Sequence, residues 1–131
     1  MRVLLDTHAW LWAASSPARL GPKTRDMLAD GGCQVLLSPA SSWEATIKWQ
    51  LGRLDLPLPP RDYVSRCMLR DALTALPVEH RHTVAVGELP DHHKDPFDRL
   101  LIAQALIEGI PLVSADTAIR AYPVEVLWAL D

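Results

Sequence analysis

Four acidic residues in this sequence are the side chains best suited to chemistry: Asp6, Glu44, Asp98 and Asp116. If they meet in the fold they repel one another, and at an effective dielectric constant of 20 two charges ~4 Å apart cost roughly 4 kcal/mol. A fold tolerates such a cluster when a cation lies among the carboxylates or when one of them is protonated. Because the set contains no His or Cys, it favours Mg²⁺ or Mn²⁺ over zinc. These ions activate water and stabilise the charge of an in-line displacement at phosphorus, which indicates phosphodiester chemistry.

The elements that must position these acids alternate between strands and helices. The predicted strands cover residues 3–5, 34–37, 73–78, 112–114 and 124–128, and the predicted helices cover 8–14, 23–30, 38 to about 52, 61–71, 79–86 and 95–109. This alternation with short loops predicts an α/β fold, a three-layer α/β/α sandwich with a central, mostly parallel sheet. Ligands of such sheets bind at the carboxyl ends of the strands. Asp6 and Asp116 follow strands there, and Glu44 and Asp98 lie in the first turns of helices that begin at the same edge.

The helix predicted at 95–109 has both of its ends marked. Asp95 is a good N-cap, Pro96 occupies a first-turn position that tolerates proline, and Gly109 is a stop signal. Apolar residues cover nearly all of its circumference, so most of the helix is expected to be buried. The polar residues that interrupt the apolar surface are Arg99, Gln104 and Glu108. We interpret Asp98 as a metal ligand and Asp95 as the cap.

Each acid also has a purely structural interpretation. Acids in a first turn complement the helix dipole, which alone would account for Asp98. Asp6 can form a turn before Thr7, Glu44 can close a capping box with Ser41, and Asp116 can cap a short helix over 117–120. The convergence of all four acids on one edge favours a shared cation site over these separate roles.

Composition limits the class of protein. The chain has 131 residues, 49% of them hydrophobic, and is expected to form one domain over 1–131. A net charge of −3 argues against a protein that coats nucleic acid non-specifically. Two cysteines, Cys33 and Cys67, are too few and too far apart for a disulfide framework or a zinc pattern. No apolar run is long enough for a signal peptide or a membrane span, so we expect a cytoplasmic protein.

Four blocks of the sequence resemble the signature blocks of the PIN domain, and specifically those of the VapC toxins of bacterial and archaeal toxin–antitoxin pairs. They are Leu-Leu-Asp-Thr-His at 4–8, Ser-Ser-Trp-Glu at 41–44, Asp-Pro-Phe-Asp-Arg-Leu-Leu-Ile-Ala-Gln-Ala at 95–105 and Leu-Val-Ser-Ala-Asp at 112–116. The resemblance runs from residue 1 to about residue 128, and the Asp-Pro-Phe-Asp-Arg block is its most specific part. It implies a PIN-like fold.

The same resemblance implies roles for individual residues. Asp6, Glu44, Asp98 and Asp116 match the family's metal-binding acids, Ser114 matches the hydroxyl position of the fourth block, and Asp95 matches an auxiliary acid. The implied activity is that of a Mg²⁺- or Mn²⁺-dependent endoribonuclease that leaves 5′-phosphate and 3′-hydroxyl ends. The implied partners are RNA, a small VapB-like antitoxin that inhibits the enzyme, and a second copy of the chain in a homodimer.

Several further residues have weaker signals. Arg99 and Lys48 lie close to the acids in the sequence and can hold a phosphate, although solvated surface charge is an equal alternative. Trp43 adjoins Glu44 and can stack on an unpaired base. The other helical tryptophans are interpreted as core or dimer-interface residues: Trp10, Trp12 and Trp49. Four histidines lack metal-ligand spacing and are predicted to be exposed to solvent: His80, His82, His92 and His93.

Two other functions are compatible with an α/β domain of this size. A phosphoacceptor, receiver-like signalling domain would carry adjacent acids after its first strand and a Lys after its last, whereas Asp6 is followed by Thr7 and His8. A catalytically silent PIN-like scaffold would bind a partner and cleave nothing, and the intact set of four acids argues against it.

Overall fold

A single five-stranded sheet organises the protein, whose computed structural model describes residues 1–131. The strands are β1 (Arg2–Leu5), β2 (Gln34–Leu37), β3 (Thr74–Ala75), β4 (Leu112–Ser114) and β5 (Val126–Trp128). Their order is β3-β2-β1-β4-β5, and every neighbouring pair is parallel. In the central strand, Leu4 pairs with Leu36 on one side and Leu112 on the other. The α/β prediction is confirmed, and the sheet is entirely parallel.

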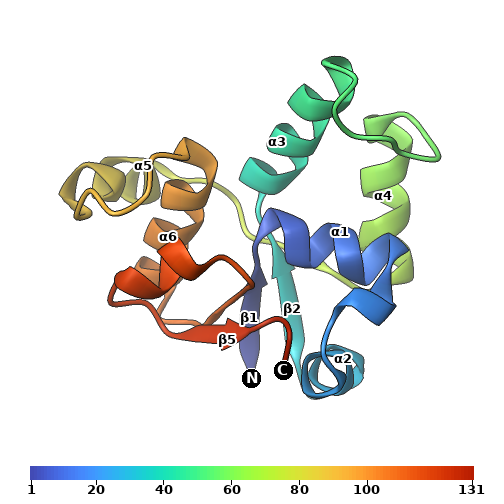
Figure 1. Cartoon of the computed structure of the whole chain (residues 1–131), viewed down its shortest axis with the longest axis horizontal. Coiled ribbons are helices and arrows are strands. Elements are labelled where there is room, and N and C mark those ends of the chain that lie inside the picture. The colour runs from blue at the N-terminus through green and yellow to red at the C-terminus, as the bar shows by residue number, and fades with distance from the viewer.

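Helices cover both faces of this sheet (Figure 1). The six α-helices are α1 (Thr7–Ser15), α2 (Pro22–Ala29), α3 (Pro39–Gln50), α4 (Pro60–Arg70), α5 (His80–Ala85) and α6 (Pro96–Glu108). Three 3₁₀ turns lie between elements: η1 (Pro17–Arg19), η2 (Val86–Glu88) and η3 (Thr117–Ala121).

The pleat of β1 supplies the core of each layer, because successive strand side chains point to opposite faces. Val3 and Leu5 belong to one core, which includes Trp10 of α1 and Tyr63 of α4. Leu4 belongs to the other core, whose helical members come chiefly from α6: Leu101, Ile102 and Ala105. Strands buried on both faces read as continuous apolar runs, which is the pattern seen at 3–5, 35–37 and 112–113.

The ends of α6 follow the predicted signals. Asp95 is the N-cap, and Gly109 ends the helix in the left-handed conformation at φ 65°. The helix is deeply buried along its middle, and Gln104 is buried as well, with its amide nitrogen 3.4 Å and 3.3 Å from the carbonyl oxygens of Leu76 and Pro77. A polar residue at this position therefore satisfies backbone groups beside the edge strand β3.

The predicted edge strand is shorter than expected. β3 is confined to Thr74–Ala75 at the sheet edge, whereas the sequence suggested residues 73–78. Pro77 lacks an N–H group and cannot continue a hydrogen-bonded ladder. β5 is likewise confined to Val126–Trp128 rather than 124–128.

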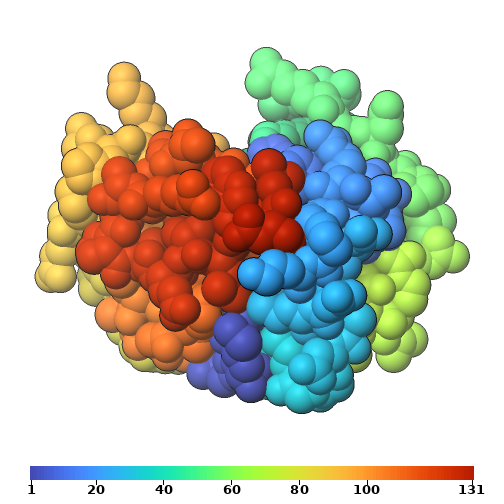
Figure 2. Space-filling view, turned by 60° about the horizontal axis from the view of Figure 1, so that its bottom comes forward, coloured from blue at the N-terminus to red at the C-terminus, as the bar shows by residue number.

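The C-terminal residues pack against the start of α2, as the space-filling view shows (Figure 2). The amides of Gly21 and Thr24 donate to the carbonyl oxygens of Ala129 and Asp131 at 2.9 and 3.1 Å. A Cβ atom at Gly21 would overlap the backbone of Asp131, so glycine is required at this close approach. None of the helices has the length and apolar character needed to cross a membrane.

Candidate functional site

The four predicted acids lie at the carboxyl edge of the sheet, and the orientations of Asp6 and Asp116 are set by their roles as helix caps. Asp6 follows β1 and caps α1, its Oδ1 accepting a hydrogen bond from the Ala9 amide at 2.8 Å. Asp116 follows β4 and caps η3, its Oδ1 accepting from the Ala118 amide at 2.9 Å. The predicted capping role of Asp116 is therefore present, and it leaves the second carboxylate oxygen directed elsewhere.

Electrostatic coupling shows that the acids meet. Burial, followed by the negative charges of Asp95 and Asp6, raises the pKa of Asp98 to about 7. The charge of Glu44 acts in the same direction, and His93 opposes it. Burial likewise raises the pKa of the Asp6 carboxyl, with a smaller contribution from the charge of Asp116. The four carboxylates thus share one site with an excess of negative charge.

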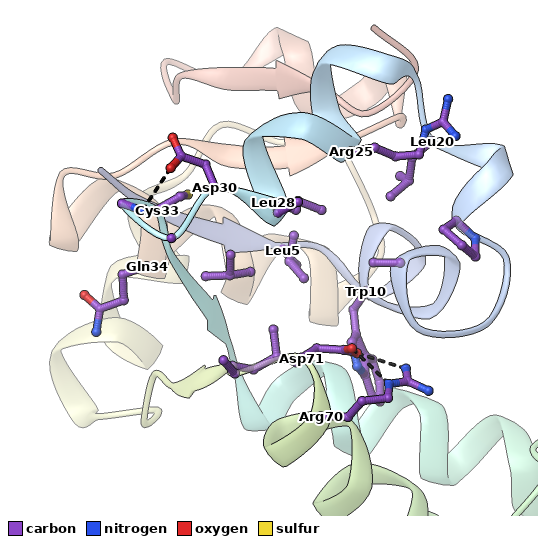
Figure 3. A pocket seen from close by; sticks show the side chains of 18 residues that line it. Leu5, Trp10, Leu20, Arg25, Leu28, Asp30, Cys33, Gln34, Arg70 and Asp71 are labelled. Atoms are coloured by element: carbon purple, nitrogen blue, oxygen red, sulfur yellow. Dashed lines mark hydrogen bonds and ion pairs between the residues drawn. The ribbon is translucent and has the colours of Figure 1, made fainter.

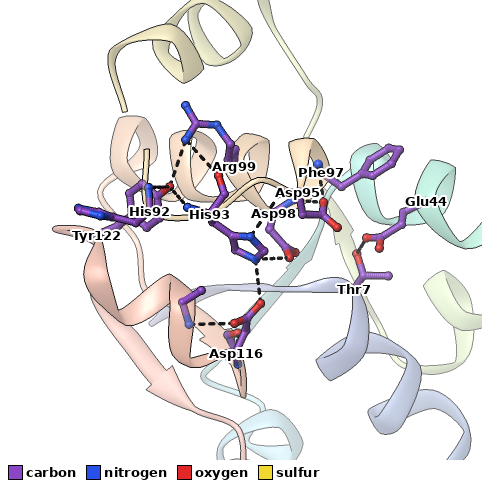
Figure 4. Close-up of polar contacts among 12 residues, drawn as sticks. Thr7, Glu44, His92, His93, Asp95, Phe97, Asp98, Arg99, Asp116 and Tyr122 are labelled. Atoms are coloured by element: carbon purple, nitrogen blue, oxygen red, sulfur yellow. Dashed lines mark hydrogen bonds and ion pairs between the residues drawn. The ribbon is translucent and has the colours of Figure 1, made fainter. Parts of the chain in front are cut away.

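Glu44 is held by both of its oxygens (Figure 4). The hydroxyl of Thr7 donates to Oε1 at 2.6 Å, and the ammonium of Lys48 donates to Oε2 at 2.7 Å. The capping box considered for Glu44 and Ser41 is not formed, because α3 is capped by Ser38, three residues earlier. Glu44 is instead a buried acid, 3% exposed. Its carboxylate is oriented by Thr7 of α1 and by Lys48 of α3, its own helix.

The two auxiliary residues act on neighbouring acids. The Oδ1 atom of Asp95 accepts from the amides of Phe97 at 2.8 Å and Asp98 at 3.1 Å, so Asp95 is the helix cap that was predicted. Ser114 is fully buried, and its hydroxyl oxygen accepts from the Asp116 amide at 3.0 Å. Its hydrogen bond to Asp6 partly counters the effect of burial on the pKa of that carboxyl.

His93 also belongs to this site, and the prediction that it is exposed to solvent is wrong. Its Nε2 atom lies 2.9 Å from Asp116 Oδ2 and 3.0 Å from Asp98 Oδ2 (Figure 4). Only 17% of the side chain is exposed. Burial would lower the pKa of His93, but the hydrogen bond to Asp116 and the surrounding carboxylates outweigh it and raise the pKa.

The loop at 90–94 is fixed by residues that sequence patterns did not connect to it. The Tyr122 hydroxyl accepts from the amides of His92 at 3.1 Å and His93 at 2.9 Å. The Arg99 guanidinium donates to the carbonyl oxygens of Pro90 and Val86 and to the Tyr122 hydroxyl. These contacts direct Arg99 toward the loop, not toward a substrate phosphate. Lys48, the other predicted phosphate contact, is paired with Glu44.

A second group of titratable residues lies apart from the four acids. His82 is fully buried, which corrects its predicted exposure, and its Nε2 is 3.2 Å from Glu108 Oε2. Its Nδ1 accepts from the Glu79 amide at 3.0 Å, and Arg81 pairs with both Glu79 and Glu108. With both ring nitrogens in hydrogen bonds and the carboxylates paired, this cluster is an ion-pair network that joins α5 to α6. His80 and His92 are exposed, as predicted.

Two aromatic side chains border the acids. Trp43 and Phe97 pack with ring centroids 5.3 Å apart and planes at 82°. Trp43 is 62% exposed, whereas Trp10, which was predicted to lie in the core or an interface, is 1% exposed in the core. Each of the two bordering aromatics directly precedes one of the acids in the sequence.

A larger cavity than the hollow beside the acids lies elsewhere in the protein. It has a volume of about 750 Å³ between α1, α2, β2 and the end of α4 (Figure 3). Its charged residues include Arg70 and Asp71, which pair with each other. A smaller hollow of about 380 Å³ is lined by Asp6, His8, Trp12 and Asp116, among others. We assign function to the smaller hollow because Asp6 and Asp116 line it and because perturbed pKa values, such as that of the Asp6 carboxyl, cluster at functional sites.

The donor set fits a hard divalent cation. Carboxylate oxygens are the ligands that Mg²⁺ and Mn²⁺ prefer. Burial and, after it, the like charges of neighbouring acids raise the pKa of Asp98, and a cation would neutralise those charges. Ligand atoms of His93, Asp98 and Asp116 lie within 4.8 Å of one another. These three residues are therefore a group that could hold a metal ion.

Comparison with protein families identifies the domain. A family model described as "PIN domain" matches residues 3–125 of the chain. Ribonuclease VapC16 of Mycobacterium tuberculosis is 41% identical over 61 residues, which make up 47% of this chain and 43% of that protein. The chain therefore aligns with less than half the length of this relative.

Solved structures share the fold over nearly the whole chain. VapBC2 from Rickettsia felis, bound to a DNA fragment from its promoter, has a TM-score of 0.71 at 16% identity and covers 97% of this chain and 98% of that one. FitAcB from Neisseria gonorrhoeae has a TM-score of 0.63 at 19% identity, with 97% of each chain covered. VapBC-1 from nontypeable Haemophilus influenzae has a TM-score of 0.63 at 14% identity, also with 97% of each chain covered. At these identities the likeness concerns the fold.

Proposed function

Because this chain belongs to the PIN domain family, we propose that it is a Mg²⁺- or Mn²⁺-dependent endoribonuclease and the toxin of a toxin–antitoxin pair. The observation that carries this proposal is the convergence of four acids, from four separate segments, on one buried edge where the pKa of Asp98 is raised to about 7. The nuclease domain is taken to be the whole of residues 1–131. Similarity to a protein named as a ribonuclease supports the activity.

Asp6, Asp98 and Asp116 are assigned as the residues that hold the cation, with Glu44 completing the set. The cation supplies activation of water and stabilisation of the charge that develops at phosphorus. Asp98 is set at the centre by the buried body of α6, and Asp95 fixes where its first turn begins. Thr7 and Lys48 hold Glu44 in a single direction, which suits an acid that must orient a water molecule.

RNA binding is assigned to residues around this edge. Trp43 is exposed beside Glu44 and is available to a base. Lys48 is assigned only a weak phosphate contact, because its ammonium is paired with Glu44. Arg99, which we considered for the same role, is given a positioning role instead, because its guanidinium holds the loop that carries His93.

The partner assignment rests on the resemblance to VapC toxins and on the structural relatives. Two of the solved relatives are named as VapBC assemblies. By analogy, this chain is proposed to bind a small VapB-like antitoxin that blocks the acidic edge, and to form a homodimer in the cytoplasm.

A cleavage assay with end analysis tests the activity. Purified protein is incubated with single-stranded RNA in Mg²⁺, in Mn²⁺ or in a chelator, and the product ends are mapped. We expect cleavage only with metal, leaving 5′-phosphate and 3′-hydroxyl ends. Metal-independent cleavage, or 2′,3′-cyclic phosphate ends, would contradict the mechanism. Uptake of a phosphoryl group from a small donor without RNA cleavage would favour the receiver-like alternative.

A further inference from the structure

A pair of aromatic side chains, Trp43 and Phe97, borders the acidic edge. Trp43 directly precedes Glu44 on α3, and Phe97 directly precedes Asp98 on α6. Each aromatic is therefore the chain neighbour of a site acid, one on α3 and the other on α6. The two rings pack edge to face, 5.3 Å between centroids and 82° between planes (Figure 4 shows Phe97 beside Glu44).

The exposure of Trp43 is unusual for its surroundings. The indole is 62% exposed, while the next residue, Glu44, is 3% exposed. Trp10 shows that the fold can bury an indole completely. An edge-to-face contact with one neighbour fixes the orientation of the Trp43 ring but leaves most of its surface uncovered. An exposed aromatic ring held in place beside a polar site offers a face on which a base can stack.

The charges of the chain itself do not favour RNA at this edge. The chain carries a net charge of −3, and the four carboxylates of the site repel phosphate unless a cation neutralises them. Two cationic side chains near the acids have partners already, since Lys48 is paired with Glu44 and Arg99 donates to backbone carbonyls. Stacking of a base on an aromatic side chain is worth about 1–3 kcal/mol and requires no positive charge.

We propose that Trp43, braced by Phe97, is the stacking platform for one unpaired base adjacent to the scissile phosphate. This inference rests on the proposed ribonuclease activity. The platform holds the nucleotide so that its phosphate lies over the acids, and it therefore determines which nucleotide position flanks the cleaved bond. A hydrophobic segment of a protein partner is the competing occupant of this surface.

The test combines a substitution in the protein with the removal of one base from the RNA. The substrates are a cleavable RNA oligonucleotide and variants in which one nucleotide beside the cleavage site is abasic. The proteins are the wild type, Trp43→Ala, Trp43→Phe and the control Trp49→Ala, which alters another partly exposed tryptophan of α3. KM and kcat are measured with metal, and Kd for the same RNAs is measured by fluorescence anisotropy in an Asp98→Asn background.

For Trp43→Ala we expect KM and Kd to rise roughly 5- to 150-fold, which corresponds to the loss of one stacking contact. kcat should fall by much less, and Trp43→Phe should recover part of the affinity. An abasic nucleotide at one position should weaken RNA binding by the wild type. It should not weaken binding by Trp43→Ala, because that variant already lacks the indole on which the base would stack. Trp49→Ala should match the wild type, and thermal denaturation should show that Trp43→Ala is folded.

The outcomes separate the inference from the proposed function. If the wild type cleaves RNA but Trp43→Ala has unchanged KM and Kd, the platform is wrong and the activity stands. If no protein cleaves RNA but Trp43→Ala still weakens binding in the abasic-sensitive manner, Trp43 stacks on a base, but the activity and the position of that base beside a scissile phosphate are wrong. If Trp43→Ala weakens only the binding of a protein partner, that partner occupies the surface and the platform is again wrong.

Discussion

Replacing Asp98 by asparagine is expected to stabilise the metal-free protein while removing its response to metal. The charge of Asp98 is unfavourable in the folded state, because burial and the neighbouring acids Asp95, Asp6 and Glu44 raise its pKa. Asparagine has nearly the same shape and no charge. The substitution therefore relieves repulsion that a divalent cation would otherwise relieve.

The size of the effect follows from the pKa. A carboxyl whose pKa rises from 3.8 to about 7 carries roughly 4 kcal/mol of unfavourable interaction in its ionised form, since each pKa unit is about 1.4 kcal/mol. This figure already contains the favourable charge of His93, which lowers the pKa. A gain of about 2–4 kcal/mol would raise the Tm of a domain of this size by about 5–20 °C.

Thermal denaturation at pH 8 measures this directly, in a chelator and in a series of Mg²⁺ concentrations. In the chelator Asp98→Asn should melt above the wild type. Mg²⁺ should raise the Tm of the wild type and leave that of the variant almost unchanged. Asp26→Asn, which removes an exposed acid of α2, is the matched control and should behave as the wild type does.

Two results would refute the reasoning. If Asp98→Asn melts below the wild type in the chelator, the charge of Asp98 does not destabilise the metal-free folded protein. If Mg²⁺ stabilises the variant as much as the wild type, Asp98 does not bind the cation.

Three further predictions use the same denaturation assay. The free energy of unfolding of the metal-free wild type should fall by about 2 kcal/mol between pH 5.5 and pH 8. Because the folded-state pKa of Asp98 is raised, its contribution to stability is greatest below the ordinary carboxyl pKa and is lost as pH rises through about 7. The raised pKa of His93 acts in the same direction, and a flat profile would contradict both. Asp95→Ala should lower the free energy of unfolding by about 1 kcal/mol, because the α6 cap is lost. Asp95→Asn should keep the cap and melt no lower than the wild type. Equal losses of stability in both variants would show that the charge of Asp95, not its capping role, matters. His93→Ala should lower the stability of the metal-free protein by about 1–3 kcal/mol, because the His93 ring bridges Asp98 and Asp116. His92→Ala, which loses a ring contact with Tyr122, should have a smaller effect. The reverse order would show that His92, and not His93, supports the site.

The sequence predicted the features of the fold that depend on local patterns. The cap at Asp95 and the stop at Gly109 are local signals, and both ends of α6 follow them. The parallel sheet follows from the alternation of apolar runs with helices. The placement of Asp6 and Asp116 follows from the rule that parallel strands end at a common edge. Each of these predictions needs only neighbouring residues or a general rule of topology.

The features that were missed depend on contacts between distant segments. His93 enters the site because Tyr122 and Arg99 hold the backbone of its loop, and nothing in the spacing of the histidines indicates those bonds. The proximity of His93 to the cap at Asp95 was the available signal, and it was outweighed by the polar loop around it. Thr7 was likewise seen only as the residue after Asp6, although it bonds to Glu44 across the site.

The lengths of the edge strands were also beyond local patterns. Residues 73–78 have the apolar character of a strand, but only Thr74–Ala75 pairs with β2. The carbonyl groups that follow are bound by the buried amide of Gln104 instead of by another strand. A helix residue thus replaces part of the expected ladder, and its polar character was first interpreted only as a break in an apolar surface.

Cleavage of one RNA by matched proteins tests the central claim most directly. Wild type, Asp98→Asn and Asp26→Asn are compared on the same single-stranded RNA, with Mg²⁺ and with chelator, after denaturation curves have shown that all three are folded. We predict that wild type and Asp26→Asn cleave the RNA only with Mg²⁺ and that Asp98→Asn does not cleave it in either condition. Equal cleavage by wild type and Asp98→Asn, or cleavage that survives chelation, would contradict the assignment of this edge as a metal-dependent ribonuclease site.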